Sequence, residues 1–327
     1  MTDAAAERGD RFLADLLAAT GRAVVGAEEP IRLIALTVVA GGHALLEDVP
    51  GVGKTLLARS VAAALGLTFA RVQGTPDLLP TDVTGSSILD GGEFRFVPGP
   101  IFANIVLVDE TNRATPRTQS SMLEAMQERQ VSAEGTTRPL PDPFIVLATQ
   151  NPVELEGTFS LPEAQLDRFL VRVRLGYPDE AGERRISRRH QAAAEPLDDI
   201  TPVADPGRLL ALREAARTVR VAEEVEAYVV GLVRATREHA DLRLGASPRA
   251  SVSLYRAAQA AALLAGRDFV LPDDVRAVAP AVLEHRLLLD IDRELRGATA
   301  AGVVAEVLDQ VELPVEPVGS AAVAGEP

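Results

Sequence analysis

The stretch HALLEDVPGVGKT, residues 43–55, decides the fold. An apolar run leads into a Pro- and Gly-rich loop, and Lys54 and Thr55 then open an amphipathic segment, LLARSVAAALG. Strand, loop and helix in this order aim successive backbone N–H groups and a helix N-terminus at one anion, which predicts a phosphate-binding loop. Lys54 would reach the β- and γ-phosphates of ATP, and the Thr55 hydroxyl would bind Mg²⁺. The predicted nucleotide contacts in this loop are Pro50, Gly51, Val52, Gly53, Lys54, Thr55 and Leu56.

The loop departs from the strict pattern G-x-x-x-x-G-K-[ST] at its first position, which holds Asp48. Pro50, Gly51 and Gly53 still keep the loop tight, so we interpret it as a variant P-loop. The alternative is an ordinary Gly-rich turn before a helix. That alternative does not explain why Lys54 and Thr55 follow directly.

Composition narrows the classes of function. The chain has 327 residues, 47% of them hydrophobic, which is enough for a large core and for two domains. Its formal charge of −14 argues against nucleic acid or an anionic membrane as the main partner. It has no Cys, and its four His lack metal-site spacing. The first ten residues lack a signal-peptide pattern and no apolar window is long enough for a membrane span, so we expect a cytoplasmic protein.

Strand and helix signals alternate in the first half of the chain. Besides the run before the P-loop, strands are predicted at 67–72, 105–109, 144–149 and 170–175, and helices at 11–20, 28–39, 116–129 and 162–169. The turn residues Asp90 to Gly92, between short apolar runs, predict a hairpin inserted after the second strand. The alternation predicts an α/β fold, a parallel doubly wound sheet flanked by helices, over residues 1–180.

Composition changes near Gly176, and only helix signals follow. We therefore expect an all-helical lid domain over residues 181–313 and a disordered tail over residues 314–327. Within the lid, Ser247 is a predicted N-cap and Pro248 a predicted first helical residue. This places Arg249 in the first turn of a helix.

Acidic and amide side chains end the two central predicted strands. Asp109 and Glu110 follow the apolar run IVLV, about 55 residues after the P-loop, and Asn151 ends ATQN. Ligands in such sheets lie beyond the carboxyl ends of the strands. Asp109 would therefore hold Mg²⁺, Glu110 would polarise a water for attack on the γ-phosphate, and Asn151 would orient that water. The structural alternative for Asp109 and Glu110 is solubilising surface charge at a strand end, and for Asn151 it is a turn before Pro152.

Three arginines are candidates for contact with phosphate. Arg168 either pairs with Asp167 at a helix end or reaches the γ-phosphate of a neighbouring subunit. Arg249 has a similar ambiguity. Arg113 follows Glu110 closely and faces either nucleotide or a partner. Residue chemistry alone leaves these alternatives open.

Taken together, these motifs resemble those of the MoxR family of AAA+ ATPases, from about residue 24 to 313. EDVPGVGKT is similar to the family's Walker A motif, whose first position is often not Gly, and IVLVDETNRA to its Walker B motif. LATQNP resembles sensor 1, LPEAQLDRF the arginine-finger segment and GASPRAS sensor 2. QGTPDLLPTDVTG through FVPGPIF resembles the helix-2 insert hairpin, in which Gly74 replaces a usual aromatic residue.

The resemblance implies an ATP-hydrolysing, Mg²⁺-dependent, chaperone-like motor that forms a homo-oligomeric ring, a hexamer, with ATP between subunits. Val25 and Gly26 would line the adenine site, Arg168 would act on the neighbouring subunit, and Arg249 would complete the nucleotide site of its own chain. The implied partner is a protein with a von Willebrand factor A domain. The client enzyme is not encoded in the sequence.

Three kinds of function remain as alternatives to this interpretation. The ATPase subunit of a metal chelatase, or a DNA-dependent AAA+ motor, shares the fold and the insert. The acidic charge disfavours DNA, and the motif spellings favour MoxR over a chelatase. A nucleotide-gated scaffold without hydrolysis is disfavoured by the intact set Lys54, Asp109, Glu110 and Arg168. A P-loop kinase would need neither the lid nor assembly.

Overall fold

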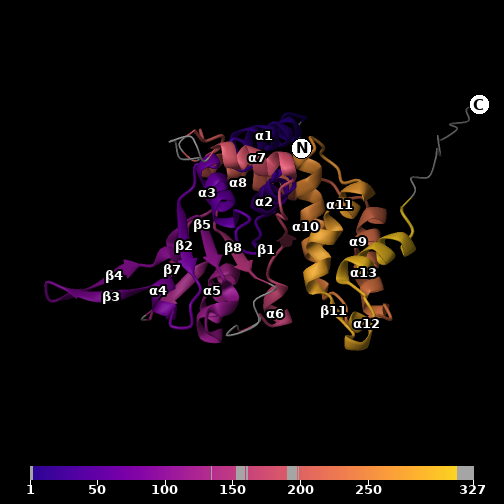
Figure 1. Ribbon diagram of the computed structural model, residues 1–327. Helices are drawn as coiled ribbons and strands as arrows, with labels where there is room; N and C mark the ends of the chain where they lie inside the picture. The colour runs from indigo at the N-terminus through magenta and orange to yellow at the C-terminus, as the bar shows by residue number, and fades with distance from the viewer. Residues whose placement is uncertain are drawn as a thin grey trace, which may run out of the picture.

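A computed structural model describes residues 3–133, 135–151, 159, 161–189, 197 and 199–314. Its centre is a five-stranded parallel sheet in the order β2-β5-β8-β1-β9. The strands are β1 (Ala44–Glu47), β2 (Phe69–Gln73), β5 (Ile105–Asp109), β8 (Ile145–Gln150) and β9 (Val171–Val173). The predicted parallel sheet flanked by helices is confirmed (Figure 1).

Alternate residues of the sheet pack on opposite layers. One face carries Leu46, Leu107 and Leu147 into a core with helices α1 (Asp3–Gly21), α2 (Glu28–Ala40) and α3 (Lys54–Ala64). The other face carries Leu45 and Val106 against α5 (Pro116–Glu128). Because both faces of the sheet are buried, the sequences of the central strands are continuous apolar runs without alternating polar residues. The carboxyl ends of β1, β5 and β8 meet at one edge, where the P-loop begins.

Two hairpins extend from the sheet layer. The predicted insert is formed by β3 (Gly85–Asp90) and β4 (Glu93–Pro98), between α4 (Pro80–Thr84) and η1 (Pro100–Phe102), and it projects far from the body (Figure 1). A second hairpin, β6 (Gln130–Ala133) with β7 (Thr136–Pro139), was not predicted. Its strands are only four residues long, so they carry almost no periodicity.

The second half of the chain is helical, as predicted, with one addition. Its elements are α7 (Glu180–Arg189), α8 (Pro206–Arg217), α9 (Glu223–Glu238), α10 (Pro248–Leu264), α11 (Pro272–Leu283), η3 (Glu284–Arg286), α12 (Ile291–Leu295) and α13 (Ala300–Gln310). The addition is a short antiparallel pair, β10 (Leu242–Leu244) with β11 (Leu288–Leu289). Two short helical turns, η2 (Thr111–Arg113) and α6 (Glu163–Leu166), lie in the first half.

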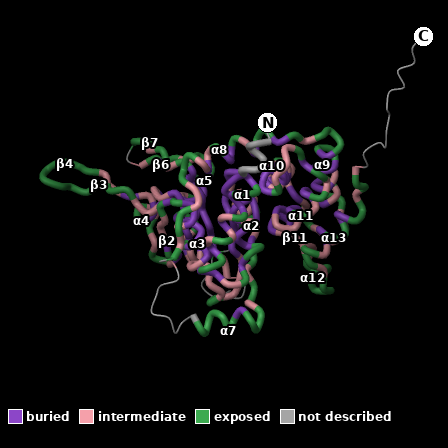
Figure 2. The backbone as a smooth tube through the Cα atoms, turned by 90° about the horizontal axis from the view of Figure 1, so that it is seen from above, coloured by how far each residue is buried: buried purple, intermediate pink, exposed green. Residues whose placement is uncertain are grey.

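The N-terminal helices connect the sheet to the lid. Helices α1 and α2 pack against α8 and α10, so one apolar core runs from the sheet into the lid (Figure 2). Within the described residues, no helix is both long and apolar enough to cross a bilayer. The predicted tail lies outside the described residues, apart from Pro314.

Candidate active site

The P-loop joins β1 to α3 and adopts a conformation that favours glycine at two positions. Gly51 has φ +84° and Gly53 has φ +93°, both in the left-handed region, and Gly53 is the N-cap of α3. Lys54 donates from Nζ to the carbonyl oxygens of Asp48 at 2.7 Å and Val49 at 3.4 Å. The loop therefore curves around the ammonium group of its own lysine.

A cavity of about 410 Å³ opens above this loop and brings most of the predicted site together. It is lined by Pro50, Gly51, Gly53, Lys54, Thr55, Leu56, Asp109, Glu110, Thr149 and Asn151. Burial lowers the pKa of Lys54, and the nearby carboxylates of Asp48, Asp109 and Glu110 oppose that effect. The cavity thus combines one cation, two strand-end carboxylates and a helix N-terminus, as a phosphate and metal site requires.

Asp109 is held by two residues that the sequence did not indicate. Its Oδ1 accepts a hydrogen bond from the Thr149 hydroxyl at 2.7 Å, and its Oδ2 accepts one from Arg71 Nη2 at 2.5 Å. The same Thr149 oxygen accepts from the backbone N–H of Glu110 at 2.8 Å. One hydroxyl on β8 therefore positions both residues at the end of β5. The sequence does show a polar residue near the end of each of the two strands that flank β5. It does not show that these strands are the neighbours of β5, because the order of strands in the sheet cannot be read from local patterns.

Glu110 has an unusual backbone and a fixed carboxylate. Its φ is +55°, a left-handed conformation that is costly for a residue with a side chain and is typical of functional positions. Its Oε2 accepts hydrogen bonds from Gln73 Nε2 and from Arg113 Nη1, both at 3.1 Å. Arg113 therefore faces the Glu110 of its own chain.

Val25 and Gly26 line a different cavity, of about 740 Å³. Its other lining residues are Leu17, Gly21, Arg22, Val24, Glu28, Ile31 and Arg185. The apolar side chains come from α1, α2 and the segment between them, and Arg185 comes from α7. These surroundings suit a flat, largely apolar ring with polar edges.

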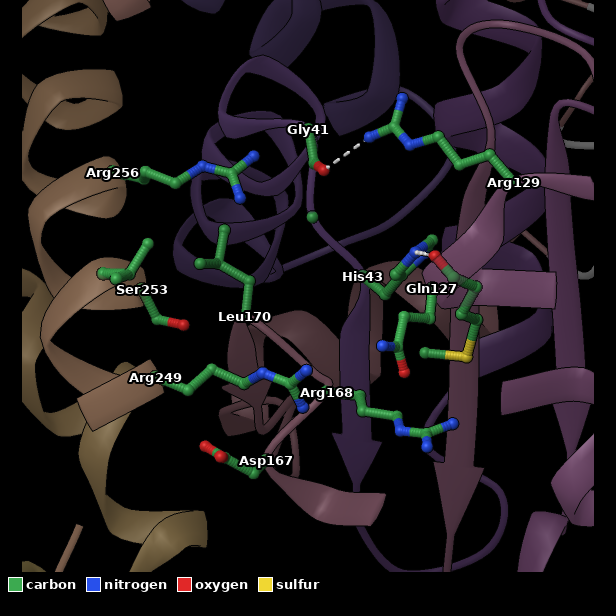
Figure 3. A pocket seen from close by; sticks show the side chains of 13 residues that line it. Gly41, His43, Gln127, Arg129, Asp167, Arg168, Leu170, Arg249, Ser253 and Arg256 are labelled. Atoms are coloured by element: carbon green, nitrogen blue, oxygen red, sulfur yellow. Dashed lines mark hydrogen bonds between the residues drawn. The ribbon is translucent and has the colours of Figure 1, made fainter. Parts of the chain in front are cut away.

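Arg168 and Arg249 meet in a third cavity, of about 310 Å³, which also contains Arg129 and Arg256. In Figure 3, Arg249 extends from α10 toward the segment that carries Arg168. This cavity shares no lining residue with the P-loop cavity. Arg249 thus lies beside Arg168, in a cavity separate from the P-loop cavity of its own chain, and its role in completing that site stays a prediction.

Comparison with known proteins identifies the family to which this chain belongs. Residues 43–171 match the ATPase family associated with various cellular activities (AAA), and residues 234–307 match the AAA lid domain. Chaperone MoxR1 of Mycobacterium tuberculosis is 44% identical over 304 residues, which is 90% of this chain and 80% of that protein. The chain belongs to the MoxR family of AAA+ ATPases. It is also 46% identical over 297 residues to protein YeaC of Bacillus subtilis, covering 90% of this chain and 92% of YeaC.

The MoxR-type fold is matched in a crystal structure as well. A protein from Cytophaga hutchinsonii superposes with a TM-score of 0.90 at 37% identity, covering 95% of this chain and 98% of that chain. Both halves of the chain, with the N-terminal helices between them, are therefore shared with an experimentally determined structure.

Gly74, the departure from the MoxR pattern, lies at the end of β2 beside the Walker B segment. Its N–H donates to the Asp109 carbonyl oxygen at 2.7 Å. A Cβ on Gly74 would lie 2.2 Å from the Glu110 carbonyl oxygen. The glycine therefore allows β2 to approach Asp109 and Glu110 closely, so this departure from the MoxR pattern affects the contact between β2 and the end of β5.

Proposed function

We propose that this chain is a Mg²⁺-dependent ATP-hydrolysing motor that works as a homo-oligomeric ring, a hexamer, and remodels or matures client proteins. The observation that carries the proposal is the separation of two sites. The P-loop cavity holds the groups for binding and hydrolysis, whereas Arg168 and Arg249 lie in another cavity of the same chain. A ring brings the arginines of one subunit to the nucleotide of the next.

The P-loop cavity suits ATP with Mg²⁺. The described residues contain no group of three or more potential His, Asp or Glu ligands for a metal ion. Mg²⁺ at nucleotide sites commonly needs only one or two protein oxygens, with phosphates and water completing its shell. Thr55 and Asp109 would supply those oxygens. When bound, Mg²⁺ would neutralise charge on the β- and γ-phosphate oxygens.

The remaining residues of the cavity have distinct roles in this proposal. Lys54 exchanges its two loop carbonyls for phosphate oxygens. Glu110, already oriented by Gln73 and Arg113, accepts the proton of the attacking water. Asn151 orients that water in line with the γ-phosphate, and Thr149 keeps Glu110 in register with Asp109.

The adenine base would lie against Val25 and Gly26. Their cavity also contains Arg185 of α7, the first helix after the segment that leaves β9. A nucleotide spanning the two cavities would contact the sheet and this helix together. That contact supports a lid whose position depends on the bound nucleotide.

The projecting hairpin supports a protein client. Leu89 and Phe94 pair across its two strands near the tip, and they are 66% and 79% exposed. Because this pair lies far from the body of the protein, it does not pack into a hydrophobic core. Exposed apolar patches of this kind commonly mark contacts with other proteins. The resemblance to MoxR proteins further suggests a partner with a von Willebrand factor A domain.

Mixed rings test the shared site. Lys54→Ala chains cannot use their own nucleotide, and Arg168→Ala or Arg249→Ala chains cannot assist a neighbour. Each variant alone is expected to be inactive, and mixing Lys54→Ala with either arginine variant should restore part of the turnover. A control mixture pairs Arg168→Ala with a chain that carries both Arg168→Ala and Lys54→Ala, and it should stay inactive. If Arg249→Ala is not rescued while Arg168→Ala is, Arg249 acts within its own chain.

A further inference from the structure

Asp167, directly before Arg168, is bound to the lid. Its Oδ1 accepts a hydrogen bond from Arg286 Nε at 2.8 Å, and its Oδ2 accepts one from the Ser247 hydroxyl at 2.8 Å. The Asp167 side chain is 18% exposed and that of Arg286 only 1%. The carboxylate is therefore occupied by two lid residues and does not pair with Arg168.

Arg286 also holds the backbone around the arginine. From Nη2 it donates to the carbonyl oxygens of Asp167 at 3.3 Å and Phe169 at 2.6 Å, and from Nη1 to that of Leu170 at 3.2 Å. These carbonyls lie on both sides of Arg168. A buried guanidinium is costly without a counter-charge, and Asp167 supplies that charge.

Ser247 extends the connection to the second arginine. It is the N-cap of α10, and its oxygen accepts a hydrogen bond from the Arg249 backbone N–H at 3.1 Å. Two hydrogen bonds thus lead from the Asp167 carboxylate to the backbone of Arg249. Asp167 is therefore both covalently next to Arg168 and connected to Arg249.

This arrangement leaves both arginines available to an external anion. Among the described residues, neither Arg168 nor Arg249 forms an ion pair, and Arg168 Nε is buried without a hydrogen-bond partner. Asp167 is the acidic residue among those that line their cavity, and its carboxylate pairs with Arg286. The two guanidiniums therefore keep their donors and their charge.

We propose that Asp167 is a positioning residue that sets Arg168 and Arg249 as one unit, facing one phosphate group of the neighbouring subunit's ATP. The inference rests on the proposed function, in which these arginines act between subunits. It adds that the two arginines move and work together, because one carboxylate fixes both. Arg286 and Ser247 act through Asp167.

Ring complementation tests the proposal. An Asp167→Ala chain keeps its own P-loop, so it should bind fluorescent ATP with unchanged affinity. Alone, it should lose roughly 10- to 100-fold in turnover, the usual effect of misplacing a catalytic group by about 1 Å. Mixed with Lys54→Ala, it should regain activity as Arg168→Ala does. Ser247→Ala, which breaks the connection to Arg249 but leaves Arg286 bound to Asp167, should show a smaller loss with the same rescue.

A matched control separates positioning from stability. Asp274 is 10% exposed and pairs with Arg267 wholly within the lid, away from both cavities. Asp274→Ala should lower the unfolding midpoint yet keep turnover. If Asp167→Ala does not fold, Asp167→Asn keeps the side-chain size and serves in its place.

Each outcome has one meaning. Normal turnover in the Asp167 variants, weakened binding of their own ATP, or no rescue by Lys54→Ala would overturn the positioning role. If instead Arg168→Ala and Arg249→Ala themselves leave turnover intact, the shared-site function fails before Asp167 is in question.

Discussion

The Asp48 carboxylate accepts a hydrogen bond from the backbone N–H of Gly176, at 2.7 Å. The same oxygen, Oδ2, accepts another from the N–H of Leu175 at 2.6 Å, while Oδ1 accepts from the N–H of Val49 at 2.9 Å. The residue that departs from the strict P-loop pattern thus ties the phosphate loop to the segment between β9 and α7. A glycine at this position would remove these three hydrogen bonds.

Replacing Asp48 should therefore cost stability. Asp48→Gly removes hydrogen bonds to a charged acceptor, each worth roughly 1.5–3 kcal/mol, and the partly exposed site places the expected total near the lower value, about 2 kcal/mol. The free energy of unfolding from denaturant titration measures this loss. Asp309→Asn removes one carboxylate charge at a side chain that is 80% exposed, and it should change that energy little. Equal stability of the two variants would contradict the structural role of Asp48.

Arg71 should compete with Mg²⁺ for Asp109. Its guanidinium lies 2.5 Å from Asp109 Oδ2 and is 47% exposed, so the ion pair is screened by solvent. Pairs of this kind contribute about 0.2–1 kcal/mol, which corresponds to roughly a 1.4- to 5-fold change in binding. Arg71→Ala should lower the Mg²⁺ concentration for half-maximal hydrolysis by that factor. Arg220→Ala, in the lid, is the control. A higher Mg²⁺ requirement would show that Arg71 assists the metal site.

His43 should make stability depend on pH. Both ring nitrogens are bonded: Nδ1 accepts from the Val146 N–H at 2.9 Å, and Nε2 donates to the Met126 carbonyl at 3.1 Å. Burial, as the main cause, lowers the pKa of His43 from 6.5 to about 4. The neutral ring therefore stabilises the fold above pH 6.5, and up to about 3 kcal/mol is lost as pH falls from 6.5 to 4.

His43→Asn tests this dependence. The amide oxygen still accepts from the Val146 N–H but does not titrate, so the variant should lose less stability between pH 7 and pH 4.5 than the native chain. Chemical denaturation at both pH values gives the comparison. The remaining slope includes His285, whose pKa burial also lowers. Parallel pH profiles for the two proteins would exclude His43 as a titrating group in this range.

The convergence of Lys54, Asp109, Glu110 and Asn151 followed from the sequence because the carboxyl ends of parallel strands meet at one edge. Local patterns, namely an apolar run, a glycine-rich loop and a polar residue at a strand end, were sufficient to predict that these residues lie together. The contact of Arg71 with Asp109 did not follow, since it depends on β2 lying next to β5. Strand order is set by long-range packing.

The position of Arg249 shows the same limit on a larger scale. Ser247 and Pro248 correctly predicted the start of its helix. Where that helix lies was decided by α1 and α2, which pack between the sheet and α10 through dispersed apolar contacts. No local motif records that packing, so the cavity shared with Arg168 became visible only in three dimensions.

Arg172 gives a last prediction, because it connects the strand before the P-loop to the lid. It donates to Glu47 Oε2 at 2.9 Å and also contacts Glu284 Oε2, and the Arg172 and Glu284 side chains are 11% and 12% exposed. Arg172→Met leaves two poorly solvated carboxylates near each other, and Arg174, whose side chain is 55% exposed, then pairs with both at 3.3–3.5 Å. Removing one partner of such a buried network typically costs 3–5 kcal/mol, so we expect a loss of about 3 kcal/mol in the free energy of unfolding.

A second substitution separates charge from packing. Adding Glu284→Gln to Arg172→Met removes one of the two carboxylates that lost Arg172 as a partner, so the double variant should be more stable than Arg172→Met alone. Arg184→Met, in an ion pair with Glu180 whose side chains are 67% and 80% exposed, should change stability by less than about 0.5 kcal/mol. If Glu284→Gln further destabilises Arg172→Met, packing of the arginine stem rather than charge pairing holds β9 to the lid.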